Sequence, residues 1–269
     1  MIFEAYLTNV ALYAIRGVEV GEYLKFPATT EEIQALLSRI EIDGKKYSEI
    51  FITNFESDVL GLYDYLDEYE DIDELNHLAH VLEEVRDNGE LEKYEAALVL
   101  GKHTASVKDL INLAQNLNIY NFQPGIETWE ALGCYYADEL MTIHIPSDIR
   151  AYFDYEAYGR DIAINEGGCF APAGYVSAAP LGFTEYYHGT EDIPAEHRVF
   201  AYPNETPHSI LETLKQLKEA PPAPKKEKTG PSHEERSDFG PAWPEAAKEV
   251  QATSTTIQST RQRPAAPKR

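Results

Sequence analysis

The sequence predicts an α+β protein: a small mixed unit, a helical middle, a second mixed unit and a disordered tail. Three observations support this prediction. Apolar and polar residues alternate near the N-terminus, which is typical of strands. From about residue 58 to residue 145 the apolar residues recur at helical spacing. The last fifty residues hold eight of the sixteen prolines and no tyrosine, a composition typical of disorder.

Residues 1–57 predict a strand–strand–helix–strand unit. The strands are expected at residues 2–8, 18–27 and 50–53. Thr29 and Glu32 have the spacing of a capping box, in which each side chain bonds the other residue's backbone N–H. The apolar residues that follow repeat at helical spacing up to Ile40, so this segment is expected to be a helix.

Residues 58–127 predict an acidic helical middle. Apolar stripes in this region and just after it indicate amphipathic helices at residues 72–85, 91–98, 107–117 and 129–140. Ser106 and Asp109 predict a capping box for the third of them. Residues 56–95 contain fifteen Asp or Glu against two Lys or Arg, so these helices are expected to carry a strongly negative surface.

Residues 128–219 predict a mixed unit. A helix is expected to start near Pro146, with Ser147 as its cap, and to be ended or bent by Gly159. Further segments are expected to be strand-like at 169–170 and 174–177, irregular at 181–202 and helical at 209–218. Residues 220–269 form the predicted disordered tail.

The charge is large and unevenly distributed. The chain carries 46 Asp or Glu and 23 Lys or Arg, a formal net charge of −23, and residues 1–219 alone hold 40 acids against 14 bases. Solubility of a small domain needs a net charge of only about 2–8. A field of this sign repels nucleic acid and anionic membranes and attracts basic surfaces. We therefore expect a basic protein partner, and neither direct nucleic-acid binding nor membrane association.

Motifs of known enzymes are absent from the sequence. It contains no G-x-S-x-G, Walker A, G-x-G-x-x-G or H-E-x-x-H pattern. His77 and His80 are interpreted as a helix-surface pair rather than a zinc site, and the acids around Asp67 and Asp71 lack the glycine of a calcium loop. Two cysteines without metal spacing, no basic leader and no long apolar run indicate a cytoplasmic protein. We expect no enzyme activity, no metal and no cofactor.

Three segments resemble the ArdA-type antirestriction proteins of plasmids, conjugative transposons and phages. Residues 152–161 read Tyr-Phe-Asp-Tyr-Glu-Ala-Tyr-Gly-Arg-Asp, an aromatic-acidic run that ends in Arg-Asp. Upstream lie Leu-Gly-Cys-Tyr-Tyr at 132–136 and Gly-Glu-Tyr-Leu-Lys-Phe-Pro at 21–27. The resemblance covers about residues 1–180. It implies an elongated, three-part DNA mimic that dimerises through its C-terminal part and occupies the DNA-binding groove of type I restriction-modification enzymes.

Acids on helices fit this implied function. Phosphates recur about every 3.4 Å along each DNA strand, and helical neighbours at i,i+3 and i,i+4 lie roughly 5–6 Å apart, so carboxylates on helical faces reach a similar charge density. The expected partner-binding acids are Asp64, Asp67, Glu68, Glu70, Asp71, Asp73, Glu74, Glu83 and Glu84. Two alternatives remain: a carboxylate-rich metal-dependent phosphoesterase, and a generic acidic adaptor for basic proteins.

The aromatic-acidic run has two interpretations. Residue pattern alone favours an amphipathic helix whose aromatic side chains lie in the core. The resemblance instead favours a surface used in self-association, which predicts a homodimer. The residues of this expected dimer motif are Tyr152, Phe153, Asp154, Tyr155, Glu156, Tyr158, Arg160 and Asp161. In that interpretation Arg160 relieves repulsion between two acidic subunits.

Overall fold

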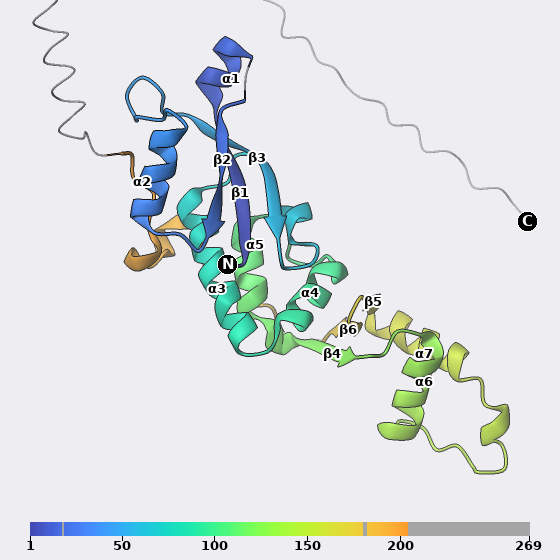
Figure 1. Cartoon of the computed structure of the whole chain (residues 1–269). Helices are drawn as coiled ribbons and strands as arrows, with labels where there is room; N and C mark the ends of the chain where they lie inside the picture. The colour runs from blue at the N-terminus through green and yellow to red at the C-terminus, as the bar shows by residue number, and fades with distance from the viewer. Residues whose placement is uncertain (18, 180–181, 204–269) are drawn as a thin grey trace, which may run out of the picture. The chain divides into compact units, whose positions relative to one another are not determined.

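Two three-stranded antiparallel sheets, with helices packed on them, form the part of the chain that the computed structural model describes: residues 1–17, 19–179 and 182–203 (Figure 1). This confirms the predicted α+β class. The predicted helix at 209–218 and the predicted tail at 220–269 lie outside the described residues. Within those residues, no helix has the length and apolar character needed to cross a membrane.

The first sheet has the strand order β2-β1-β3. Its strands are β1 (Phe3–Asn9), β2 (Gly21–Phe26) and β3 (Ile50–Ser57), so the second strand starts later than predicted. Phe3 pairs with Phe26 and Tyr6 with Tyr23, which puts alternate residues on opposite faces. The inner face is buried, and helix α2 (Thr30–Arg39) packs against it. The outer face carries Tyr6 and Tyr23.

The predicted capping box of α2 is confirmed, whereas one short helix was missed. Thr29 and Glu32 bond each other's backbone N–H groups. Helix α1 (Val10–Arg16) follows β1 directly, capped by Asn9, whose Oδ1 accepts from the backbone N–H of Leu12 at 3.0 Å. The Asn9 side chain is buried and donates to the carbonyl of Ile40 at 2.9 Å, so tertiary contacts stabilise this helix.

The three helices predicted in the middle are confirmed as α3 (Ile72–Asp87), α4 (Leu91–Leu100) and α5 (Val107–Gln115). Ser106 caps α5 by accepting from Asp109 N–H. The prediction that residues 58–145 are helical was wrong at residues 120–124, which form strand β4 (Tyr120–Pro124). This strand depends on pairing with a segment about fifty residues later in the chain, which the local spacing of apolar residues does not reveal.

The second sheet has the order β4-β6-β5 and connects two hydrophobic cores. Strands β5 (Cys169–Ala171) and β6 (Gly174–Ala178) confirm the two predicted strand segments. Val176 belongs to the first core, which also contains the first sheet and helices α3–α5. Its neighbour Tyr175 belongs to the second core with Leu132 and Ala163. The three-part division of the chain stays a prediction.

The second core lies between helices α6 (Trp129–Cys134) and α7 (Tyr155–Glu166), and a π-helical turn follows α6. The predicted boundaries of α7 were wrong. Asp154 caps it, it passes through Gly159, and it ends at Gly167 with φ +62°. Gly159 is buried against α6, so it serves close packing and does not terminate the helix.

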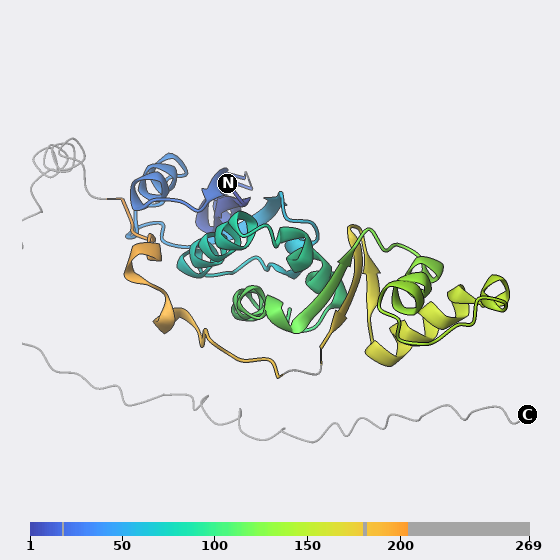
Figure 2. The same cartoon turned by 90° about the horizontal axis from the view of Figure 1, so that it is seen from below.

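Residues 182–203 return along the helices without strands or α-helices, as predicted (Figure 2). Buried asparagines hold this segment in place. Asn112 of α5 accepts from the backbone N–H groups of Tyr186 and Tyr187 at 2.8 and 3.0 Å and donates to the Tyr187 carbonyl at 2.7 Å. Asn76 of α3 donates to the carbonyl of His197 at 3.0 Å.

Candidate partner-binding surface

All the acidic side chains of the described residues reach the surface. Of the 37 Asp and Glu residues there, 26 are exposed, 11 are half-buried and none is buried. The buried polar side chains in the same part of the chain belong to Thr, Asn, His and Ser. A buried carboxylate without a partner is costly, so the fold leaves its negative charge where solvent or a partner can reach it.

The nine acids predicted for partner binding fall into two groups. Four of them are exposed, and their carboxylates form no hydrogen bond or ion pair with a distant segment among the described residues: Asp64, Asp67, Glu68 and Glu84. They lie on the connection from β3 to α3 and on the last turns of α3. These four are the best placed of the set to present charge to a partner.

The remaining five have structural contacts. Asp73 Oδ1 accepts from Val199 and Phe200 N–H, both at 2.7 Å, and Glu74 accepts from the Tyr187 hydroxyl at 2.9 Å. Asp71 caps α3, and Glu83 pairs with Arg86 at 3.4 Å. These carboxylates already accept hydrogen bonds or pair with a cation within the protein, so their charges are less available to a partner. Sequence pattern could not separate them from their neighbours.

Glu70 is half-buried in a hollow of about 340 Å³ that Asp64 and Asp67 also line. Its carboxylate accepts from Asp67 N–H at 3.2 Å. Burial, and then the neighbouring acids, raise the pKa of Glu70 above its usual value. No group of three or more His, Cys, Asp or Glu is placed to hold a metal ion anywhere in the described ranges.

The aromatic-acidic run divides between exposed side chains and a cluster of three half-buried aromatic rings. Phe153 contacts the rings of Tyr155 and Tyr158, with centroids 4.9 and 5.6 Å apart. The Tyr155 hydroxyl donates to Asp138 Oδ2 at 3.0 Å, and the Tyr158 hydroxyl bonds Thr142 at 2.8 Å. Burial and the Asp138 carboxylate raise the pKa of Tyr155. These three aromatic side chains therefore pack within the protomer.

The other members of the run are available at the surface. Tyr152 is 87% exposed, and Asp161 is also exposed. Arg160 pairs with Glu156 one turn earlier at 2.7 Å, so this cation already has an acidic neighbour within α7. Asp154 serves as the helix cap. The run thus combines an internal aromatic cluster with one strongly exposed tyrosine.

The comparison with protein families identifies the chain. The family described as Antirestriction protein (ArdA) matches residues 5–177, which include all seven α-helices of the described part and both sheets except for the first two residues of β1 and the last residue of β6. The chain belongs to the ArdA antirestriction family. Membership implies an antirestriction function directed at restriction-modification enzymes, and the description names no catalysed reaction. No curated protein matches the chain.

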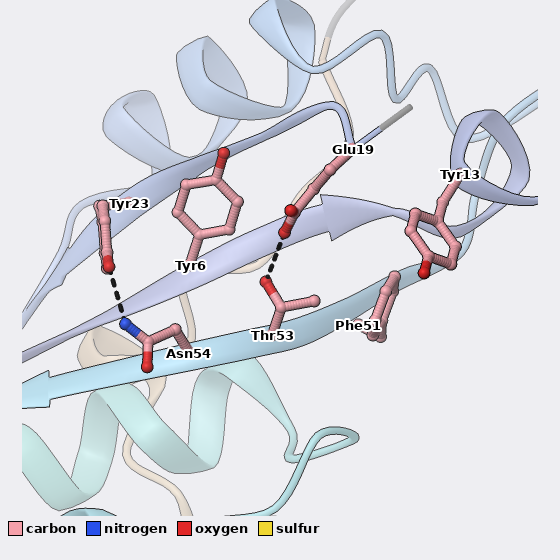
Figure 3. A pocket seen from close by; sticks show the side chains of 7 residues that line it. All are labelled: Tyr6, Tyr13, Glu19, Tyr23, Phe51, Thr53 and Asn54. Carbon is pink, nitrogen blue, oxygen red and sulfur yellow. Dashed lines mark hydrogen bonds between the residues drawn. The ribbon is translucent and has the colours of Figure 1, made fainter. Parts of the chain in front are cut away.

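Two features of this ArdA-family protein escaped the sequence analysis. The surface interpretation of His77 was wrong: the side chain is buried, with Nδ1 at 2.9 Å from His197 Nδ1, because residues 182–203 cover this face of α3. His80 is half-buried and stacks on His197 at 4.1 Å. The second feature is a tyrosine-lined hollow on the outer face of the first sheet (Figure 3). Its residues come from three strands, from helix α1 and from the connection between α1 and β2, so no local motif marks it.

Proposed function

We propose that this ArdA-family protein inhibits restriction as a DNA mimic that occupies the DNA-binding groove of a type I restriction-modification enzyme. The observation that carries the proposal is the placement of all 37 described acids at least partly at the surface, 26 of them exposed. A groove built to neutralise phosphates with Lys and Arg would gain from binding such a surface, because its cations would displace the counterions held by the carboxylates, as they displace those condensed on DNA.

The proposed contacts use the exposed acids rather than the whole acidic segment. Asp64, Asp67, Glu68 and Glu84 combine exposure with the absence of a competing distant donor among the described residues. Each exposed charge contributes little by itself, typically under about 1 kcal/mol, so inhibition is expected to come from many carboxylates together. It should therefore weaken as salt screens the attraction.

A homodimer forms part of the proposal. Several large apolar side chains are exposed around α6 and α7, including Met141 at 79%, Tyr152 at 87% and Ile164 at 70%. Burial of exposed apolar groups against a second copy is favourable. This gain is needed because the like net charges of two copies repel each other. Arg160 and its partner Glu156 lie on the same helix as Ile164.

Competition on the enzyme's DNA site tests the function. A type I methyltransferase core is bound to a labelled duplex, and the purified protein is added at increasing concentration in a gel-shift assay. The proposal expects release of the duplex at low salt and weaker release at higher salt. An unrelated acidic protein of similar net charge should release much less. A duplex that stays bound at saturating inhibitor overturns the mimicry.

A further inference from the structure

The outer face of the first sheet contains a hollow of about 450 Å³ whose walls are mostly aromatic. Tyr6 and Tyr23 come from paired strands, Phe51 from β3 and Tyr13 from α1. Glu19, on the connection from α1 to β2, also lines it. The inner face of the same sheet is buried by the first core, so the rings of the outer face have no part in that core.

The aromatic rings stand in two pairs with Glu19 between them (Figure 3). Tyr6 and Tyr23 meet edge to face with centroids 4.9 Å apart, and Tyr13 and Phe51 meet similarly at 5.9 Å. Tyr13 remains 53% exposed. In an edge-to-face pair the edge of one ring meets one face of the other, so the pair itself does not use the remaining ring faces, and ring faces carry the negative side of the aromatic quadrupole.

Hydrogen bonds fix the Glu19 carboxylate in this hollow. Its Oε1 accepts from the Thr53 hydroxyl at 3.0 Å and lies 3.5 Å from the Thr8 hydroxyl. Both contacts involve the same oxygen. Glu19 is itself exposed. Hydrogen bonds to Oε1 thus orient the carboxylate, and a carboxylate has about four acceptor sites, so it can also accept from a ligand.

A second polar chain supports the opposite wall. Asn54 Nδ2 donates to the Tyr23 hydroxyl at 2.8 Å, and that hydroxyl donates to Glu56 Oε1 at 2.8 Å. These two bonds hold the Tyr23 ring at this wall, where its face can meet a cation. The hollow therefore offers a positioned carboxylate, uncovered ring faces and a second acid nearby.

We propose that this hollow binds the guanidinium of an arginine side chain that the basic protein partner presents. A guanidinium is planar, stacks on aromatic faces and bonds carboxylates through its N–H groups, so it uses both chemistries of the site at once. The inference rests on the proposed function for its partner. It adds a discrete pocket to what would otherwise be a diffuse attraction between charges.

A short peptide pair tests the pocket without any restriction enzyme. The full chain, labelled with ¹⁵N, is titrated with acetyl-Gly-Arg-Gly-amide and with the same peptide carrying citrulline, a neutral isostere of arginine. The arginine peptide is expected to shift the amides around Tyr6, Glu19 and Phe51 and to bind at least about fivefold more tightly than the citrulline peptide.

Two variants with the same change in charge locate the effect. Glu19→Gln keeps an acceptor for Thr53 but removes the negative charge, and it is expected to abolish the preference for arginine. Glu92→Gln removes an equally exposed carboxylate on α4 and should keep that preference. Circular dichroism confirms that both variants are folded.

The outcomes separate this inference from the proposed function. The arginine pocket is overturned if both peptides bind equally tightly. It is also overturned if the Glu19→Gln variant shows the same amide shifts with the arginine peptide. Either result holds even if the protein still displaces DNA from the enzyme. Arginine selectivity that depends on Glu19 supports the pocket even if the gel-shift competition fails.

Discussion

Gly133 of α6 and Gly159 of α7 face each other where the two helices cross. A Cβ added to Gly159 would lie 2.7 Å from the backbone nitrogen of Gly133 and would overlap the carbonyl oxygen of Trp129. A Cβ added to Gly133 would overlap the carbonyl oxygen of Tyr155. The backbones approach this closely because neither residue has a side chain. Two segments that the sequence shows separately, 132–136 and 152–161, therefore form one structural unit.

Gly159→Ala should destabilise the protein by about 2–4 kcal/mol, because the added methyl group must separate two packed backbones. Urea unfolding monitored by circular dichroism measures this change. Gly182→Ala is the matched control, since a Cβ at that position meets nothing within 4 Å. Equal stability of the two variants would contradict the tight helix crossing.

The acids of the middle region should separate into functional and structural members. Asp67→Asn with Glu68→Gln is expected to weaken DNA displacement by about two- to tenfold at low salt, with stability changed by less than about 0.5 kcal/mol. Asp73→Asn with Glu74→Gln is expected to lower stability by about 1–3 kcal/mol, because both side chains accept from residues 187–200. Gel-shift competition and urea unfolding on both pairs give the comparison. The reverse pattern would contradict the assignment.

The protein should become less stable on mild acidification, because His77 is protonated more readily in the unfolded chain than in the folded one. Burial, and then His197 and His80, lower the pKa of His77 to about 4, whereas the unfolded chain titrates at about 6.5. Between these values the unfolded state binds more protons, so stability decreases as pH falls through this window. Between pH 7 and pH 5 the free energy of unfolding of the unmodified protein should fall by about 1–2 kcal/mol more than that of the His77→Gln variant.

Unfolding in urea at several pH values checks this dependence. Burial of His77 supplies the main structural reason, and the short Nδ1–Nδ1 contact with His197 excludes protonation of both rings, since one of the two nitrogens must lack a proton to accept. His144→Gln is the control because His144 is exposed. A His77→Gln variant that retains the full acid sensitivity would sink this explanation.

Asn112→Ala should release residues 182–203 from α5. The change leaves the N–H groups of Tyr186 and Tyr187 and the carbonyl of Tyr187 without their present partner, at a cost of about 2–4 kcal/mol. Amide hydrogen exchange should accelerate at Tyr186 and Tyr187 before the rest of the protein unfolds. Asn118→Ala alters an exposed asparagine and is expected to leave both amides protected.

Self-association should depend on the exposed apolar residues around α7. Tyr152→Ala with Ile164→Ala is expected to convert a dimer to a monomer, since aromatic anchors often contribute 2 kcal/mol or more. Each substitution occurs twice in a two-fold interface, so its effect on dimer stability is doubled. Light scattering measures the mass, and Leu60→Ala with Tyr69→Ala removes comparably exposed side chains elsewhere. An unchanged dimer would reject this surface. Tyr155 and Tyr158 are unsuitable targets because both bond within the protomer.

The sequence by itself determined the features that depend on neighbours along the chain. The capping box of Thr29 and Glu32, the helices α3, α4 and α5, and the strands β5 and β6 all follow local patterns. The excess of acids and the three family-like segments led directly to the antirestriction family. Caps, apolar stripes and charge act over a few residues, so they can be interpreted without a fold.

Only the tertiary structure decided which residues meet across long separations. Strand β4 exists because it pairs with β6, and Gly159 continues a helix because α6 lies against it. Asp73 and Glu74 became internal acceptors, and His77 became buried, because residues 182–203 return to α3. In the sequence, Asp73 and Glu74 look like the acids around them and His77 looks like His80, so their residue types do not reveal which side chains are buried or bonded. Burial and donor position, which the long-range fold determines, separate the two groups.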